Sequence, residues 1–367
     1  MPVLLIITDG MADCCGYGSP TPLREADTPC MDRLASIGAC GLVDTSMADG
    51  EAPGSDFAIL SLLGYNPPPR QARGALEAIG IGVTLSERDV AYRCNFIASD
   101  GCGIEIENPQ WIDSGIVNRL CCCINNAVGM PHMYPIDNSH AVCIFDKSCG
   151  RNYAREYEAR VKEILSKDVP DNVGVYREKS RITGIRLWGE SDKPEYSRFD
   201  RCRAAVVCAV PLVRGIAGAI GMDLIVPEGA TGGTDTCYQA KIEAALHALR
   251  SGYEFVLLHV EAPDAASHDR DRRRKIATIE AIDRHIVSHA VEWISATPDA
   301  IVAMTPDHAT DVLTGKHSPD PVPFVIAGRS SIPDSVCHFD ELSAQQGAFG
   351  QIEAQRFMQL LLSSSAG

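Results

Sequence analysis

The chain has 367 residues, of which 45% are hydrophobic, so it can bury one large core and a second, smaller one. Its net charge of -15 and its short, acid-flanked basic runs argue against a nucleic-acid partner. The N-terminus does not have the pattern of a secretion signal, and no apolar stretch approaches membrane-spanning length. We therefore expect a cytoplasmic protein without a membrane partner.

The first part of the chain alternates strand and helix patterns. Residues 3–7 are an apolar run that predicts a strand leading into Thr8-Asp9-Gly10. Thr28-Pro29 predicts a helix start, with Thr28 as the N-cap and proline in the first turn. A short apolar helix is expected over 57–63, and its N-terminal turn carries Ser55.

Residues 68–178 have a different pattern. Short strands such as 91–97 and 141–145 mix with helices such as 153–165, and glycine, asparagine and proline separate them. This segment contains no group of side chains that we assign to a metal cluster. We therefore predict a separate, smaller α+β domain, inserted into the core as a cap or substrate domain.

From Ile185 onward, strands and helices alternate again. Strands are expected over 204–209, 223–226, 255–260, 301–305 and 323–327, and helices over 211–220, 237–250 and 269–295. Repeated βα units predict an α/β core with a doubly wound, mostly parallel sheet. The core domain would comprise residues 1–67 and 179–367.

Acidic and histidine side chains follow the ends of three predicted strands. In open parallel sheets, ligands bind at the edge where the carboxyl ends of the strands meet. Mixed carboxylate and imidazole sets suit Zn, Mn and related divalent ions, with three or four ligands for each ion. Together with the Ser55 hydroxyl, the candidate set would fill two such sites: Asp9, Asp264, His268, Asp307, His308 and His317.

Each of these residues has a plainer interpretation when taken alone. Asp9 and Asp264 are typical of a turn cap and a helix N-cap, and His268 and His317 are typical of surface histidines. Asp307-His308 directly after an apolar strand is more telling. It is the shared position at one sheet edge that favours a metal site.

Ser55 also has two interpretations. It is either a helix N-cap or a nucleophile, and a serine hydroxyl must be activated by a base or a metal. No histidine or lysine lies next to Ser55 in the sequence, which favours metal activation. Its place at a helix N-terminus suits a phosphorylated serine, because free N–H groups attract anions there. Two divalent ions would serve an in-line phosphoryl transfer.

Several motifs together resemble the alkaline phosphatase superfamily and, within it, the archaeal-type cofactor-independent phosphoglycerate mutases. They are Asp9-Gly, Pro-Gly-Ser55-Asp, Glu-Ala-Pro-Asp264-x-x-x-His268, Thr-Pro-Asp307-His308 and Lys-His317-Ser-x-Asp-Pro-Val-Pro. The resemblance covers nearly the whole chain. It implies an alkaline phosphatase-like core and two ions drawn from Mn, Zn, Co or Mg. Asp264, His268 and His317 would hold one ion, and Asp9, Asp307, His308 and the Ser55 oxygen would hold the other.

The resemblance also implies a reaction, the interconversion of 3-phosphoglycerate and 2-phosphoglycerate in glycolysis and gluconeogenesis. Ser55 would carry the phosphoryl group, 2,3-bisphosphoglycerate would not be needed, and the inserted domain would act as a lid that excludes water. A small phosphorylated carboxylate needs cationic anchors. The candidates, each with an equally simple structural interpretation, are Arg73, Arg93, His140, Lys179, Arg181 and Lys316.

Two segments depart from the family pattern, namely Lys179-Ser180-Arg181 and the three prolines after Asn66. They leave open a homoserine kinase-like, phosphatase or phosphonate-cleaving activity on the same core. A metal-binding regulatory protein with an inactive site is a further alternative, although retention of Ser55 and all six ligands counts against it. The absence of a P-loop or kinase motif argues weakly against an ATP-dependent enzyme. Assembly into a homo-oligomer stays open.

The sequence contains fifteen cysteines, a high number. Neither Cys14-Cys15 nor Cys121-Cys122-Cys123 has the C-x-x-C spacing that is typical of zinc and redox sites. Cysteine is also a small, readily buried side chain. We therefore expect reduced thiols in a reducing cytosol and no catalytic thiol.

Overall fold

The chain folds into two compact units. The first comprises Met1–Pro69, Tyr196–Val210 and Ile220–Gly367, and the second comprises Arg70–Glu195 and Pro211–Ala219. The structure is a computed structural model. It describes residues 1–16, 18–47, 49–67, 72–100, 102–107, 109, 112–150, 152–167, 176–177, 180–328 and 332–363.

The first unit is built on an eight-stranded sheet. Its strand order is β10-β9-β11-β1-β12-β15-β2-β16. In this order, β10, β9, β11, β1 and β12 run parallel to one another. Strand β15 is antiparallel to both of its neighbours, and β16 is parallel to β2. The predicted mostly parallel sheet is therefore confirmed. Along the sheet, the strands are Asp223–Ile225, Ala204–Val207, Phe255–Val260, Val3–Thr8, Ile301–Thr305, Val322–Gly328, Gly38–Asp44 and Gln351–Glu353.

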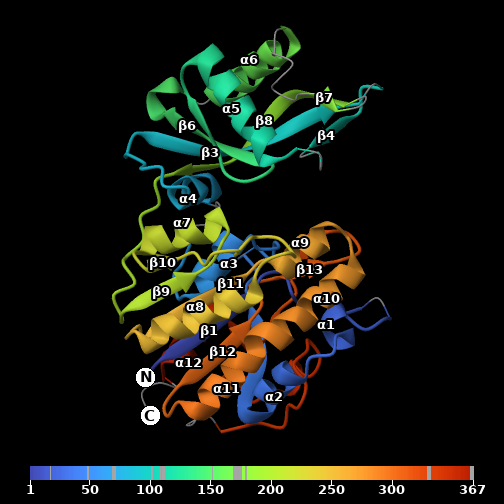
Figure 1. Cartoon of the computed structure of the whole chain (residues 1–367), viewed down its shortest axis with the longest axis vertical. Coiled ribbons are helices and arrows are strands. Elements are labelled where there is room, and N and C mark those ends of the chain that lie inside the picture. The colour runs from blue at the N-terminus through green and yellow to red at the C-terminus, as the bar shows by residue number, and fades with distance from the viewer. Residues whose placement is uncertain are drawn as a thin grey trace. The chain divides into compact units, whose positions relative to one another are not determined.

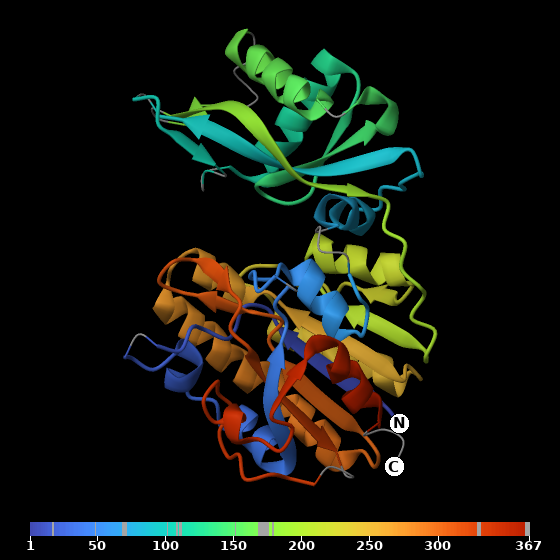
Figure 2. The same ribbon diagram turned by 180° about the vertical axis from the view of Figure 1, so that it is seen from behind.

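Helices cover both faces of this sheet. Figure 1 shows α8 (Tyr238–Arg250), α10 (Arg272–Ile282) and α11 (Ser288–Ala296) over one face. Figure 2, turned by 180°, shows α3 (Ser55–Leu62) and α12 (Ala354–Ser363) over the other. The central strands are consequently buried on both sides, which explains why they are continuous apolar runs in the sequence.

The core under α8 and α10 is a single hydrophobic cluster. Leu4 and Ile6 of β1 lie in it together with Val256 of β11, Ile242 of α8 and Ile279 of α10. Alternate residues of β1 point to the same face, so Leu5 and Ile7 belong to the opposite side, and both are fully buried. β1 therefore contributes apolar side chains to the core on both faces of the sheet.

The long helix predicted over 269–295 is confirmed as one continuous helical segment over 272–296, although it is not α-helical throughout. It consists of α10 and α11, joined by a π-helical turn over Asp283–Val287. Asp283 lies in this turn and accepts hydrogen bonds from the N–H groups of Cys30 and Met31, at the start of α2 (Pro29–Ile37). Thr28, the predicted cap of α2, makes no side-chain capping bond. An acidic side chain from a distant helix caps α2 instead.

The second unit contains an antiparallel sheet in the order β5-β6-β3-β8-β7, with β4 paired to β3. Helices α5 (Ser114–Val128) and α6 (Tyr153–Lys167) share a hydrophobic core with it, which includes Phe96 of β3. The strands of this sheet are β5 (His132–Pro135), β6 (His140–Asp146), β3 (Asp89–Ser99), β8 (Ser180–Asp192), β7 (Tyr176–Arg177) and β4 (Glu105–Glu107).

The bounds of the second unit differ from those predicted for the inserted domain, 68–178. Strand β8 lies within the second unit because it pairs along β3 from Val90 to Ser99. Helix α7 (Pro211–Ile220) also contributes to this unit as far as Ala219. It lies directly against α4 (Arg73–Gly80): a Cβ at Gly80 would lie 1.8 Å from the Pro211 carbonyl oxygen. The predicted roles of core and cap domain stay predictions.

Replacing Gly215 in α7 with alanine is expected to lower the free energy of unfolding by about 1–3 kcal/mol. Its Cβ would lie 1.7 Å from the Leu76 carbonyl oxygen, a backbone atom of α4, so the two helices would have to shift apart. Gly218→Ala in the same helix is the control, since the added Cβ would meet the Ile79 γ2 methyl group at 2.8 Å and no backbone atom of α4, and alanine favours helix. Urea unfolding compares the two variants, and equal losses would contradict this account of the helix contact.

The described part of the chain contains no helix with both the length and the hydrophobicity that crossing a bilayer requires.

Candidate metal centre

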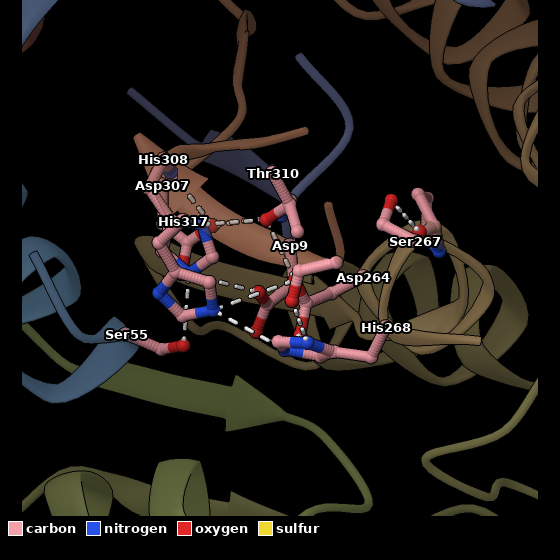
Figure 3. A network of polar contacts seen from close by, with 12 residues as sticks. Asp9, Ser55, Asp264, Ser267, His268, Asp307, His308, Thr310 and His317 are labelled. Atoms are coloured by element: carbon pink, nitrogen blue, oxygen red, sulfur yellow. Dashed lines mark hydrogen bonds and ion pairs between the residues drawn. The ribbon is translucent and has the colours of Figure 1, made fainter. Parts of the chain in front are cut away.

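The site lies where β11, β1 and β12 end. These strands are neighbours and run parallel, with Ile7 of β1 paired to His259 on one side and to Thr305 on the other. Asp9 directly follows β1, α9 (Ala262–His268) follows β11, and Asp307-His308 follows β12. Figure 3 shows side chains from these segments facing one another. The structure thus brings the predicted strand-end residues to one edge of the sheet.

The first group consists of Asp264, His268 and His317. One turn of α9 places Asp264 and His268 on the same face, with Asp264 Oδ2 and His268 Nε2 3.0 Å apart. His317 Nε2 lies 3.7 Å from Asp264 Oδ1 and 3.3 Å from His268 Nε2. His317 lies in the short strand β14 (Lys316–Ser318), which pairs with β13 (Ala309–Asp311).

Backbone carbonyls orient both imidazoles of this group. His268 Nδ1 lies 2.9 Å from the Gly315 oxygen, and His317 Nδ1 lies 2.9 Å from the Pro53 oxygen. A carbonyl only accepts, so each Nδ1 carries the proton and each Nε2 faces Asp264. This is the arrangement that orients histidine ligands of protein-bound metals.

The second group consists of Asp9, Asp307 and His308, with Ser55 beside it. His308 Nε2 lies 3.4 Å from Asp9 Oδ1 and 3.4 Å from Asp307 Oδ2. Ser55 is the first residue of α3, and its Oγ lies 3.2 Å from the same Nε2. One imidazole nitrogen therefore faces two carboxylate oxygens and the serine hydroxyl.

Gly10 allows the two groups to approach each other. It adopts φ +58°, a left-handed conformation, and donates its N–H to Asp307 Oδ1 at 3.1 Å. A Cβ at this position would lie 2.4 Å from Asp264 Oδ1 and 2.7 Å from Thr310 Oγ1. Glycine is therefore required after Asp9 for a steric reason, because any side chain at this position would overlap Asp264 and Thr310.

The electrostatics of the centre call for a cation. Asp9 and Asp307 are buried, and within the described part of the chain no donor reaches Asp9 Oδ1 or Asp307 Oδ2. Burial and the Asp307 charge raise the pKa of Asp9 well above its usual value. Burial and the Asp264 charge raise the pKa of Asp307 to about 8. Carboxylates desolvated in this way are costly without a positive partner, so the residues fit a divalent ion.

Asp264 behaves differently. Burial raises the pKa of Asp264, but the hydrogen bond from His268 and the charges of the surrounding histidines outweigh that effect and lower it overall. The same hydrogen bond raises the pKa of His268 to about 9. His268 is thus the cation that balances Asp264 in this structure, a role that a bound metal ion would take over.

Sequence reasoning missed His259. Its Nε2 lies 3.0 Å from Asp9 Oδ2, and with Asp9 and Glu261 it forms a third group of ligand-type side chains. Burial, together with the charge of Lys241, lowers the pKa of His259 to about 3, so the ring is neutral and donates to Asp9. The available signal was a histidine inside the otherwise apolar run Phe255–Val260.

Two predicted substrate arginines lie together in the second unit. Arg73 Nε lies 3.1 Å from Glu77 Oε1, and Arg93 bonds to the same oxygen. Both guanidinium groups lie 5.5 Å from the centre of the Trp188 ring. A buried glutamate and a tryptophan thus hold two cations side by side. Neither partner was predicted from the sequence.

Of the remaining predicted anchors, His140 is close to this pair, because it stands opposite Asn95 of β3, two residues from Arg93. His140 lies beside Asp137, with its Nδ1 2.9 Å from Asp137 Oδ1. Arg181 donates to the Leu165 carbonyl oxygen and stands opposite Ser99 of β3. Ser99 is six residues from Arg93 along this strand, which places the Arg181 backbone roughly 20 Å from that of Arg93. Lys316 is exposed in β14. The remaining candidate, Lys179, lies outside the described residues.

Comparisons with known proteins show the family to which the chain belongs. The model of the Metalloenzyme superfamily matches residues 1–364. A 2,3-bisphosphoglycerate-independent phosphoglycerate mutase of Methanothrix thermoacetophila is 33% identical over 404 residues, covering 99% of this chain and 100% of the relative. A second such enzyme, from Methanothermobacter thermautotrophicus, is 33% identical, covering 100% of this chain and 98% of the relative.

Solved structures support the fold. The PH0037 protein from Pyrococcus horikoshii superposes with a TM-score of 0.84 at 31% identity, covering 100% of this chain and 97% of that one. A cofactor-independent phosphoglycerate mutase from Thermoplasma acidophilum shares the fold, with a TM-score of 0.63 at 22% identity and 99% of each chain covered. The resemblance drawn from the sequence motifs is confirmed. The chain belongs to the metalloenzyme superfamily and, within it, to the family of 2,3-bisphosphoglycerate-independent phosphoglycerate mutases.

Proposed function

We propose that this protein interconverts 3-phosphoglycerate and 2-phosphoglycerate by two-metal phosphoryl transfer through Ser55. The observation that carries this proposal is the buried pair of Asp9 and Asp307. Each has one oxygen near His308 and the Ser55 hydroxyl, and neither oxygen has a hydrogen-bond donor among the described residues. The names of the two archaeal relatives, which align over nearly the full length of both chains, support the choice of substrate.

We assign one divalent ion to each group of ligands. Asp264, His268 and His317 would hold the first ion, and Asp9, Asp307, His308 and Ser55 Oγ would hold the second. This mixed donor set suits Mn, Zn or Co, and Mg less closely. When bound, the ions would supply positive charge for the attacking and leaving oxygens.

The residues of the chain would carry out the transfer itself. Ser55 Oγ forms a bond to phosphorus while the bond to the glycerate oxygen breaks, and the serine proton passes to that oxygen. The phosphoryl group then returns to the other glycerate hydroxyl, so 2,3-bisphosphoglycerate is not required. The N-terminal N–H groups of α3 favour the phosphorylated serine. Ser55 is only 7% exposed, which limits attack by water.

The arginine pair of the second unit is the proposed anchor for substrate anions. Arg73 and Arg93 present two guanidinium groups that share Glu77, and a guanidinium binds carboxylate or phosphate in a bidentate fashion. His140 belongs to the same proposal, because both arginine charges contribute to lowering its pKa, after burial as the largest cause. Arg181 and Lys316 stay predictions, as does Lys179.

A reducing compartment is part of this proposal. All fifteen cysteines are free thiols. Burial raises the pKa of Cys14 and of Cys40 to about 12, so these two thiols are poor nucleophiles. Fifteen thiols without a disulfide are the usual state in a reducing cytosol, and we place the reaction there on this ground.

The proposed function is tested by incubating the reduced protein with Mn²⁺ and 3-phosphoglycerate in the absence of 2,3-bisphosphoglycerate. Phosphorus NMR is expected to show 2-phosphoglycerate without accumulating free phosphate. Free phosphate as the only product would indicate a phosphatase instead. If nothing changes, the proposal fails, and homoserine with ATP or a phosphonate becomes the next substrate to try.

Removing the metal is expected to abolish turnover. Prolonged dialysis against a chelator should leave the two carboxylates of the second group desolvated and unbalanced, which lowers the midpoint of thermal unfolding as well. Adding back Mn²⁺ should restore both activity and stability. Full turnover in protein shown by elemental analysis to be free of metal would contradict the assignment.

A further inference from the structure

Thr310 lies between the two ligand groups. Its side chain is buried, and its Oγ1 lies 2.7 Å from Asp264 Oδ1 and 3.1 Å from His308 Nδ1. Asp264 belongs to the first group and His308 to the second. Figure 3 shows the dashed contacts that lead from Thr310 toward both. One hydroxyl therefore contacts a ligand of each proposed metal site.

The single proton of this hydroxyl sets the direction of both bonds. An ionised carboxylate only accepts hydrogen bonds, so Thr310 must donate to Asp264 Oδ1. The hydroxyl oxygen then accepts from His308, which places the ring proton on Nδ1. His308 Nε2 is thereby left as the nitrogen that faces Asp9, Asp307 and Ser55.

The backbone around Thr310 is anchored on several sides. Its N–H donates to the Ala12 oxygen at 3.0 Å, and its carbonyl oxygen accepts from the buried Lys275 Nζ at 2.7 Å. In the β13–β14 pair, Thr310 stands opposite His317, the third ligand of the first group. Because the main chain is anchored, the hydroxyl stays within reach of both candidate ligands, and the direction of its O–H bond follows the position of Asp264.

We propose that Thr310 is a positioning residue that couples the two metal sites through its hydroxyl. An ion that orders Asp264 in the first group also orders the Thr310 hydroxyl, and with it the His308 ring of the second group. Filling one site therefore raises the affinity of the other, and the same holds in reverse. This inference rests on the proposed two-metal function.

Two substitutions distinguish the contribution of the Thr310 hydroxyl from that of its methyl group. Thr310→Val keeps the shape and removes the hydroxyl, whereas Thr310→Ser keeps the hydroxyl and removes the methyl group. Calorimetric titration with Mn²⁺ alone measures the stoichiometry and both affinities without any turnover. Circular dichroism and thermal unfolding of the metal-free proteins verify that each variant is folded.

The wild type and Thr310→Ser are expected to bind two ions in one coupled step. In Thr310→Val, the weaker of the two affinities should fall by about 10–100-fold and the titration should separate into two steps. Two ions bound by Thr310→Val with wild-type affinities would overturn the inference and leave the proposed function standing. An equal loss in Thr310→Ser would also overturn it, since packing of the methyl group would then be responsible. Fewer than two ions in the wild type would overturn the proposed function and this inference together.

Discussion

Ser55→Ala is expected to lower turnover of 3-phosphoglycerate by about 10⁴-fold or more, the scale on which removing a nucleophile acts. The variant lacks the oxygen that would accept the phosphoryl group, at the start of α3 and 3.2 Å from His308 Nε2. Asp9, Asp307 and His308 remain, so Mn²⁺ should still bind to the second group with reduced affinity. Phosphorus NMR follows turnover, and mass spectrometry of the wild type with substrate detects the phosphoserine.

Ser61→Ala in the same helix is the matched control. Ser61 is fully buried, and its hydroxyl has no hydrogen-bond partner within the described part of the chain. Removing an unsatisfied buried hydroxyl is expected to leave stability unchanged or to raise it, with turnover close to that of the wild type. Full turnover in Ser55→Ala would show that another group accepts the phosphoryl group.

Lys275→Met is expected to lower the free energy of unfolding by about 3–5 kcal/mol, the cost of leaving one charge of a buried pair without its partner. Lys275 is 0% exposed, and its Nζ donates to Asp13 Oδ2 at 2.9 Å and to the carbonyl oxygens of Ala12 and Thr310. Methionine fills the space but satisfies none of these acceptors. Urea unfolding of the purified variant measures the loss.

Arg274→Met serves as the control for this prediction. Arg274 is the neighbouring residue of α10, is half-exposed and forms ion pairs with Asp269 and Asp271 at the surface, so its loss should cost less than about 1 kcal/mol. Adding Asp13→Asn to Lys275→Met removes the uncompensated carboxylate and is expected to recover part of the stability. A Lys275→Met variant as stable as Arg274→Met would refute the buried-pair account.

The convergence of the candidate ligands could be predicted because a parallel sheet has one carboxyl edge. Apolar runs over residues 3–7, 255–260 and 301–305 indicated strands, and the acidic and histidine side chains after them were expected to converge. The register of β1 with β11 and β12 places Asp9 and Asp307 together. The prediction depended on local hydrophobic pattern and a general property of parallel sheets, so it did not require the strand order.

The residues that support the ligands could not be predicted in this way. His259 bonds to Asp9 across 250 positions of sequence, and Thr310 bonds to Asp264 across 46. Nothing in the residues flanking Thr310 distinguishes it from a threonine in any short strand. Its role depends on the distance between two groups that only strand pairing and the turn at Gly10 bring close.

The sequence by itself determined the α/β class, the buried strands, the six ligand-type side chains and Ser55, because these follow from hydrophobic periodicity and from motifs read locally. Only the tertiary structure decided the strand order and the extent of the second unit, with β8 and most of α7 in it. It also decided the buried partners, such as Asp283 at the start of α2 and Lys275 at Asp13. Such contacts join residues hundreds of positions apart, and they form only where packing excludes water and leaves a polar group in need of a partner.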